Sequence, residues 1–138
     1  RPKHVIEHLE RVRRIQDETG GFTAFIPWTF KKGNTMLDHI KEVPSTYYLK
    51  VLALSRIYLD NFKNVQSSHV TQTMQVGIIG LHFGANDLGS VMIEENVISS
   101  TSYKVNIPKV EDMVDAIRSA GFIPAQRDTY YRIVRVFN

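Results

Sequence analysis

Amide, hydroxyl, imidazole and carboxylate side chains recur just beyond the ends of three predicted strands. The candidates, in chain order, are Thr29, Gln66, Ser68, His69, Asn86, Asp87, Glu94 and Glu95. In parallel α/β barrels the carboxyl ends of the strands form the active-site face, so side chains at such positions would converge. A buried polar group is unfavourable unless it meets a ligand or an internal partner. As a set these residues indicate a functional site, although each one taken singly can be a cap or a solvated side chain.

Other chemical patterns in the sequence are weaker. His4 and His8 lie four residues apart, as two metal ligands on one helix face would, but no third ligand is evident nearby. Gly84 and Gly89 lack the Lys-Ser/Thr pair of a phosphate-binding loop. The chain has no cysteine, which excludes disulfides, thiolate nucleophiles and cysteine-ligated clusters within it. We therefore expect no metal ligands in this chain.

The composition is that of a globular protein, with 43% hydrophobic and 22% charged residues. The apolar runs fall far short of the roughly 20 residues that a membrane span requires, so we expect a cytoplasmic protein without membrane contact. The net charge of +3 includes Arg11, Arg13 and Arg14 on one predicted helix, which indicates a solvated helix face rather than a nucleic-acid surface. A chain that starts at Arg1 within a helical pattern is typical of a piece of a longer protein.

Apolar periodicity predicts helices that alternate with short strands. The expected helices run from Val5 to the stop at Gly20-Gly21, from Ser45 through Leu59, from Val70 to Leu81, and from Val110 to Gly121. The expected strands cover 22–26, 64–68 and 88–93, residues 28–41 form a loop, and the tail 128–137 is a strand or a packed extension. Ser45 suits the N-cap of the second helix, and Gly121 suits the position after the last helix.

The alternation of helices and strands predicts a parallel sheet covered by helices, which is an α/β fold. Three or four such units make about half of a (β/α) barrel, whose usual length is about 250 residues. We therefore expect residues 1–138 to form one partial-barrel domain. Half a barrel leaves unpaired sheet edges, so either a missing amino-terminal half or self-association would cover them.

Several stretches carry a resemblance to a known family. They are 20–30, 55–61, 64–68, 83–96 and 121–129, which occur in order along the chain. Over essentially its whole length the chain is similar to the cyclic dehypoxanthinyl futalosine synthases, which are radical S-adenosylmethionine enzymes of the futalosine route to menaquinone. The Gly-Ala-Asn-Asp segment is shared with aminofutalosine synthases and deazaflavin-cofactor synthases, whereas the Ile-Pro-Trp-Thr-Phe form points to the cyclase.

The resemblance implies a barrel of the radical S-adenosylmethionine type. The intact enzyme would bind a [4Fe–4S] cluster through a CxxxCxxC motif near its amino end and would cleave S-adenosylmethionine. The resulting radical would take a hydrogen from the ribose of dehypoxanthine futalosine, and the sugar radical would close onto the aromatic acid. The motif is absent from this chain, so we expect the chain alone to hold neither cofactor and to be inactive.

The resemblance also suggests which residues bind the cofactor and the substrate's polar groups. Ile26 and Pro27 match the strand end near the adenine of S-adenosylmethionine. Gln66, Ser68 and His69 would contact polar groups of the substrate. Similar sequences often carry Trp where this chain has His69, so stacking there is replaced by hydrogen bonding or proton transfer.

Further expected roles fall on the third strand and its loop. Asn86 and Asp87 would bind ribose hydroxyls or orient a neighbour, and Glu94 or Glu95 would accept the proton lost on rearomatisation. In full, the expected substrate-binding residues are Thr29, Gln66, Ser68 and Asn86, and the expected catalytic residues are His69, Asp87, Glu94 and Glu95.

Two alternatives to the cyclase remain open from the sequence. One keeps the enzyme class but changes the step, to that of an aminofutalosine or deazaflavin-cofactor synthase. The other is a non-catalytic half-barrel that acts as a binding or assembly module.

Overall fold

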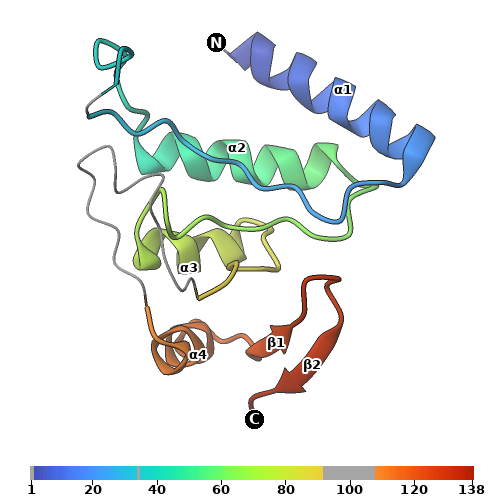
Figure 1. The fold of residues 1–138 in the computed structure, drawn as a ribbon, viewed down its shortest axis with the longest axis vertical. Helices are drawn as coiled ribbons and strands as arrows, with labels where there is room; N and C mark the ends of the chain where they lie inside the picture. Colours follow the sequence, from blue (N-terminus) through green and yellow to red (C-terminus); the bar gives the residue numbers. More distant parts are fainter. Residues whose placement is uncertain (1, 34, 92–107) are drawn as a thin grey trace.

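The helices and extended segments follow one another in the predicted order. Figure 1 shows the computed structural model, which describes residues 2–33, 35–91 and 108–138. Its elements are α1 (Pro2–Thr19), α2 (Ser45–Tyr58), α3 (Met74–His82), α4 (Val110–Ser119), β1 (Ala125–Arg127) and β2 (Ile133–Val136). None of the helices in these ranges is long and apolar enough to cross a membrane.

Glycines end two of the helices, as predicted. Gly20 follows α1 with φ 58°, and its N–H donates to Gln16 O at 2.8 Å. Gly121 follows α4 with φ 85°, and its N–H donates to Arg118 O at 2.9 Å. A left-handed conformation after the last helical turn is nearly free of steric cost only for glycine, so these positions fix where each helix stops.

Three extended segments lie side by side in a parallel arrangement. Phe25 pairs with Val65, and Gln66 pairs with Asp87, both in parallel. The Phe25 N–H donates to Asn64 O at 3.0 Å, and the Gln66 N–H donates to Phe25 O at 2.9 Å. The predicted parallel pairing is therefore present, but as isolated bridges rather than long strands. The second bridge lies at Asp87, just before the predicted strand 88–93. Residues 88–91 are described and form no strand, so that part of the prediction is wrong, and residues 92 and 93 lie outside the described residues.

Two helix starts differ from the prediction. Ser45 is not the cap of α2, because Pro44 occupies that position and the Ser45 hydroxyl donates to Gln72 Oε1 at 3.0 Å. The third helix begins at Met74 and not at Val70, because the Thr73 hydroxyl accepts from the Val76 N–H at 3.2 Å and caps it there. The Ser45 hydrogen bond is a tertiary contact, whereas the Thr73 cap is local to the start of α3.

The carboxy-terminal tail forms an antiparallel hairpin, which corrects the expectation of parallel strands throughout. β1 pairs with β2 in a two-stranded sheet, with an irregularity in register between Gln126 and Arg127. Tyr131 has φ 61° in the connection, where the chain reverses. The tail is therefore a strand in part, one of the two possibilities that the sequence left open.

Two apolar clusters fasten the helices to the parallel segments. Their buried members are Tyr48, Leu52, Val65 and Ala85 in the first, and Leu9, Leu59 and Phe62 in the second. Phe25 packs against both clusters, so the first segment lies between them. Leu52 and Leu59 are fully buried, and each contributes about 1.5–3 kcal/mol by burial.

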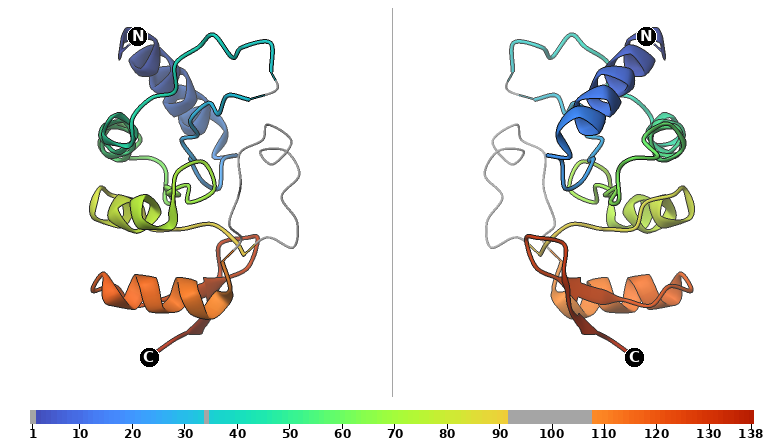
Figure 2. Two further views of the ribbon diagram at one scale, coloured as in Figure 1. Left: turned by 90° about the vertical axis from the view of Figure 1, so that its left-hand side faces the viewer. Right: turned by 90° about the vertical axis from the view of Figure 1, so that its right-hand side faces the viewer.

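Figure 2 shows α2, α3 and α4 in a row along one side of the molecule, with the paired segments beside them. α1 contacts α2, and α2 contacts α3. The helices thus cover one face of the three parallel segments, and the side chains on the opposite face are those that can meet a ligand.

Candidate functional site

The alternation of side chains along the parallel segments defines two faces. Phe25 and Val65 are bridge partners, and both pack into the cluster under α2. Successive side chains of an extended segment point to opposite faces, so Ile26 and Gln66 point away from the helices. Asp87 is the bridge partner of Gln66 and shares its face. We call Ile26, Gln66 and Asp87, with the residues that contact them there, the open face.

The Asp87 carboxylate is the most highly coordinated polar group on the open face. Its Oδ1 accepts from the Gly89 N–H at 2.6 Å and from Arg127 Nη2 at 3.0 Å, and its Oδ2 accepts from Arg127 Nε. Only 10% of the Asp87 side chain and 21% of the Arg127 side chain are exposed. A fork of two donors fixes the plane of a carboxylate, so Asp87 has one orientation.

Two residues of the carboxy-terminal hairpin, Asp128 and Tyr131, hold the Arg127 side chain in place. Arg127 Nη1 donates to Asp128 O at 3.1 Å, and its guanidinium carbon lies 3.9 Å from the centre of the Tyr131 ring. The hydrogen bond to Asp87 raises the pKa of Arg127 above its ordinary value. Burial, with a smaller effect of the Asp87 charge, raises the pKa of the Tyr131 phenol, which therefore stays neutral at physiological pH.

Gln66 lies beside this pair with its carboxamide uncommitted. The side chain is half-buried, and it makes no hydrogen bond to another residue in the described ranges. A Cβ at Gly89, whose φ is +85°, would lie 2.5 Å from Gln66 Nε2. Glycine is therefore required at 89, because any side chain would displace the carboxamide. A donor and an acceptor are left available next to Asp87.

The carboxyl end of the second segment is a buried network of hydroxyl groups. The Ser68 N–H donates to the Tyr48 hydroxyl at 2.8 Å, and Ser68 Oγ accepts from Thr71 Oγ1 at 2.9 Å. Thr29 Oγ1 accepts from Gln72 Nε2 at 2.7 Å. Ser68 is only 1% exposed, and these hydrogen bonds order the turn after the segment. The geometry thus gives Ser68 and Thr29 internal partners at the place where substrate contacts were expected.

His69 is buried under α3. A Cβ added at Gly77 would lie 3.1 Å from His69 Cβ, so the helix passes directly over this residue. Burial lowers the pKa of His69 below its ordinary value of 6.5, while a hydrogen bond with the backbone of Ser90 acts in the opposite direction. The imidazole is neutral at physiological pH as a result.

Asn86 does not join Asp87 on the open face, contrary to the expected grouping. Its Oδ1 accepts from Arg56 Nη2 at 2.8 Å and from the Val65 N–H at 2.9 Å, and its Nδ2 donates to Asn64 Oδ1 at 3.3 Å. These partners lie at the amino end of the segments. Asn86 and Asp87 point to opposite faces because they are adjacent in extended chain. The geometry gives Asn86 a structural role.

Ile26, Pro27, Glu94 and Glu95 are the remaining predicted site residues, and the structure describes the first two of them. Ile26 is 41% exposed at the end of the first segment, so an apolar surface is available there, whereas Pro27 is buried. Glu94 and Glu95 lie outside the described residues. Among the described ranges no group of three His, Asp or Glu side chains could hold a metal ion.

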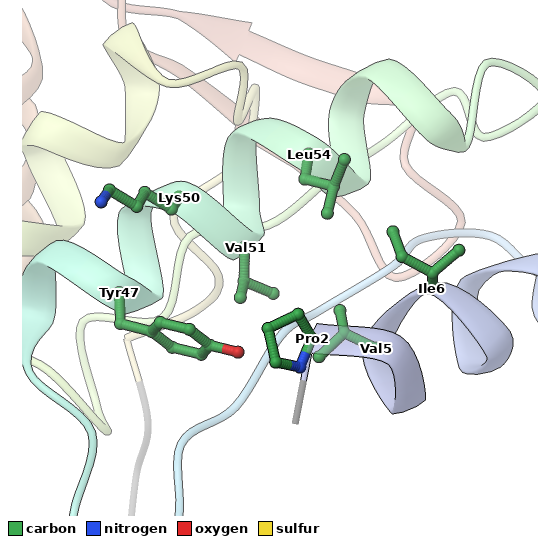
Figure 3. Close-up of a pocket in the computed structure, with 7 residues that line it drawn as sticks. All are labelled: Pro2, Val5, Ile6, Tyr47, Lys50, Val51 and Leu54. Atoms are coloured by element: carbon green, nitrogen blue, oxygen red, sulfur yellow. The ribbon is translucent and has the colours of Figure 1, made fainter.

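An apolar pocket of about 130 Å³ lies elsewhere, between α1 and α2 (Figure 3). Val5 and Ile6 of α1 face Val51 and Leu54 of α2 across it. No predicted site residue lines this pocket. It belongs to the helix layer and not to the open face.

Arg127 and Tyr131 are the functional candidates that the sequence did not single out. Arg127 is 40 residues from Asp87 in the chain, so local spacing could not pair them. One signal was available: a lone Arg in the stretch 121–129, which matched the family, follows the short run Phe122–Gln126. Only the hairpin shows that this residue reaches the third segment.

Known relatives agree with the family suggested by the motifs. The chain is 52% identical over 132 residues to the cyclic dehypoxanthine futalosine synthase of Halalkalibacterium halodurans, and 46% identical over 126 residues to that of Streptomyces coelicolor. These alignments cover 94% and 91% of this chain, but 35% and 31% of the two relatives. The chain thus spans about a third of the length of these curated relatives.

A less similar relative is named for a different activity. The chain is 41% identical over 138 residues to the 5-amino-6-(D-ribitylamino)uracil–L-tyrosine 4-hydroxyphenyl transferase of Methanococcus maripaludis strain C7, covering 95% of this chain and 38% of the relative. The family model for the CofH/MqnC C-terminal region matches residues 19–137. This match extends over most of the chain, from the end of α1 to the end of the hairpin, and so the chain belongs to the CofH/MqnC C-terminal region family.

Proposed function

We propose that the full-length protein is a cytoplasmic radical S-adenosylmethionine enzyme that cyclises dehypoxanthine futalosine in menaquinone biosynthesis. The observation that carries this proposal is the order of similarity. Two relatives named cyclic dehypoxanthine futalosine synthase are 52% and 46% identical to the chain, and the methanogen transferase is 41% identical. The open face, which carries Gln66 and Asp87, supplies groups that suit a ribosyl substrate.

The proposed architecture is a barrel to which residues 1–138 contribute one partial-barrel domain. The parallel bridges that join Phe25 to Val65 and Gln66 to Asp87 support this proposal, because neighbouring barrel strands pair in parallel. The open face would then point into the barrel, and an amino-terminal region of the kind that the longer relatives contain would complete it. Self-association through the exposed edges is the alternative arrangement.

The residues of this chain fit contact with S-adenosylmethionine but not with a [4Fe–4S] cluster. No cysteine is present, so this chain does not fit the cysteine ligands of a [4Fe–4S] cluster. The exposed Ile26 side chain at the end of the first segment fits contact with an adenine ring, as an apolar surface next to the polar open face. S-adenosylmethionine, when bound in the full-length enzyme, supplies the radical that abstracts hydrogen.

The residues of this chain would bind, orient and shield the substrate. Asp87 accepts a hydrogen bond from a ribose hydroxyl, and Gln66 offers a donor and an acceptor to a second one. His69, which is buried and whose pKa lies below its ordinary value, would hydrogen-bond the substrate or transfer a proton. Glu94 or Glu95 takes the proton released on rearomatisation. The roles of Asp87 and Gln66 are supported by their position on the open face, whereas those of Glu94 and Glu95 rest on the resemblance.

The direct test is product analysis with the reconstituted full-length enzyme under anaerobic conditions. We expect dehypoxanthine futalosine to be converted into its cyclic isomer, detected by mass spectrometry with coupled chromatography. Incubation with 5-amino-6-(D-ribitylamino)uracil and tyrosine serves as the second arm. Turnover of that pair, with dehypoxanthine futalosine left unchanged, would replace the cyclase by the transferase activity.

Asp87→Asn tests the site itself. We expect kcat/KM to fall about 10- to 100-fold, because a hydrogen bond to a charged acceptor is replaced by a weaker one. Asp115→Asn is the matched control, since Asp115 is exposed on α4 and, within the described part of the chain, pairs with Arg118 alone. Wild-type turnover by a folded Asp87→Asn enzyme would remove Asp87 from the site.

A further inference from the structure

We propose that Arg127 is a positioning residue, which the carboxy-terminal hairpin places behind Asp87 so that the carboxylate presents one free acceptor to a sugar hydroxyl beside Gln66. This inference rests on the proposed function, since it assigns a role toward the substrate of that same site. It adds the hairpin to the site and names a ligand class, a ribosyl or ribityl group with neighbouring hydroxyls.

The geometry of the ion pair requires arginine. Arg127 Nε and Nη2 each donate to a different oxygen of Asp87, which is the bidentate arrangement of a guanidinium with a carboxylate. With the Gly89 N–H at 2.6 Å, three donors are committed to this carboxylate. An ammonium group is a single point charge and cannot reproduce the planar fork. The plane of Asp87 is therefore set by Arg127.

The structure of the hairpin directs the Arg127 side chain toward the third segment. The register of β1 and β2 shifts between Gln126 and Arg127, and such irregularities re-aim a side chain out of the regular sheet. The guanidinium carbon lies over the Tyr131 ring, at 3.9 Å from the ring centre. Tyr131 itself has φ 61°, a conformation that costs energy in a residue with a side chain. These features together hold the fork toward the third segment.

The Gln66 carboxamide beside the ion pair is uncommitted. It packs against the backbone of Gly89, and it has no hydrogen-bond partner among the residues that the structure describes. A fixed carboxylate next to an uncommitted amide matches two neighbouring hydroxyl groups, each of which donates one hydrogen bond and accepts another. A polyol chain or ribose ring meets that description.

The test is a double-mutant cycle on substrate binding by the full-length enzyme. Equilibrium dialysis without reductant measures the Kd of dehypoxanthine futalosine in the absence of turnover. We expect Arg127→Ala and Asp87→Asn each to raise Kd about 10-fold or more, on the order of one lost charge-assisted hydrogen bond. We expect the double variant to bind no more weakly than Asp87→Asn alone, because Arg127 acts through Asp87. Fully multiplicative effects would overturn the proposal.

Two further variants separate positioning from folding. Arg127→Lys keeps the charge and is expected to fold, yet to raise Kd like Arg127→Ala; wild-type affinity in this variant would contradict the proposal. Added guanidinium at millimolar concentration should restore part of the affinity of Arg127→Ala but not that of Arg127→Lys. Arg135→Ala is the matched control, since Arg135 lies on the same hairpin over the Phe137 ring and has no contact with Asp87. Its Kd should be unchanged.

The outcome is separable from that of the proposed function. Product analysis of the wild-type enzyme decides which reaction occurs. If the enzyme turns over 5-amino-6-(D-ribitylamino)uracil instead, the same cycle is measured with that ligand, whose ribityl chain carries neighbouring hydroxyls. Coupling between Arg127 and Asp87 would then support the positioning role, and its absence would refute it.

Discussion

At the scale of single residues, the chain keeps several polar groups buried or half-buried by giving each one hydrogen-bond partners. Arg56 shows this most clearly: Nε donates to Gly84 O at 2.6 Å, Nη1 to Phe62 O at 3.1 Å and Nη2 to Asn86 Oδ1 at 2.8 Å. Its partners are neutral, and burial lowers the pKa of this guanidinium. Arg56 therefore organises the amino ends of the segments, while Asp87 and Gln66 serve the opposite face.

Burial of His69 predicts a pH dependence of stability. The folded-state pKa of His69 lies below the ordinary value of 6.5, so the unfolded state binds the proton more readily. The stabilising effect of a neutral His69 is fully present above pH 6.5 and is lost as the pH falls below it toward the folded-state pKa. Urea unfolding of the wild type and of His69→Gln between pH 7.5 and 5 measures how the free energy of unfolding depends on pH.

We expect the curve of His69→Gln to be flatter over that window than the wild-type curve. His39→Gln, at an exposed position in the loop before α2, serves as the control and should keep the wild-type slope. Parallel curves for the wild type and His69→Gln would show that His69 does not titrate differently on folding.

At the scale of elements, α3 lies unusually close to the second parallel segment. A Cβ at Gly80 would meet Ser67 Oγ at 2.2 Å and Leu52 Cδ2 at 3.0 Å. The helix can approach the segment only because residue 80 has no side chain. This close approach buries Ser67 and Ser68 and thereby orders the polar turn at the carboxyl end of the segment.

Gly80→Ala should therefore destabilise the protein by about 1–3 kcal/mol, the usual effect of overpacking. Helix propensity acts in the opposite direction, because alanine is favoured over glycine by about 1 kcal/mol in a helix interior. Gln75→Ala, at an exposed position of the same helix, is the control and should be close to neutral. The free energy of unfolding, measured by urea titration, tests this prediction. A Gly80→Ala variant more stable than the wild type would contradict the close packing.

At the scale of the whole molecule, the hairpin and the open face leave apolar surface uncovered in the described part of the chain. Ile133, Val134 and Val136 of β2 are 62%, 58% and 49% exposed, and Trp28 is 58% exposed. Exposed strands of this kind pair readily with other chains. In the proposed enzyme this surface would be covered by the rest of the barrel.

The 138-residue chain by itself should therefore self-associate. We expect its sedimentation coefficient to rise with concentration in analytical ultracentrifugation, and we expect Val134→Lys to weaken that rise by placing a charge on the strand. Ile57→Lys is the control, because Ile57 is 77% exposed on α2, away from the sheet edge. A concentration-independent monomer would refute this prediction.

Much of the fold follows from local sequence. The stops at Gly20 and Gly121, the end of the first segment at Pro27 and the loop after it were predictable, because glycine and proline limit the backbone wherever they occur. The family was also predictable, since its motifs are continuous stretches. The barrel rule predicted that Gln66 and Asp87 lie close together, but it grouped Asn86 with them, and the expectation for Ile26 came from the resemblance.

Other features depended on tertiary contacts. Asn86 faces away from Asp87 because the register between the segments places it beside Arg56. The pairing of Arg127 with Asp87 joins residues 40 positions apart through a hairpin. The sequence by itself thus determined where the chain turns and which family it belongs to, since those depend on neighbouring residues. Only the tertiary structure decided which side chains meet, because that depends on the register between segments distant in the chain.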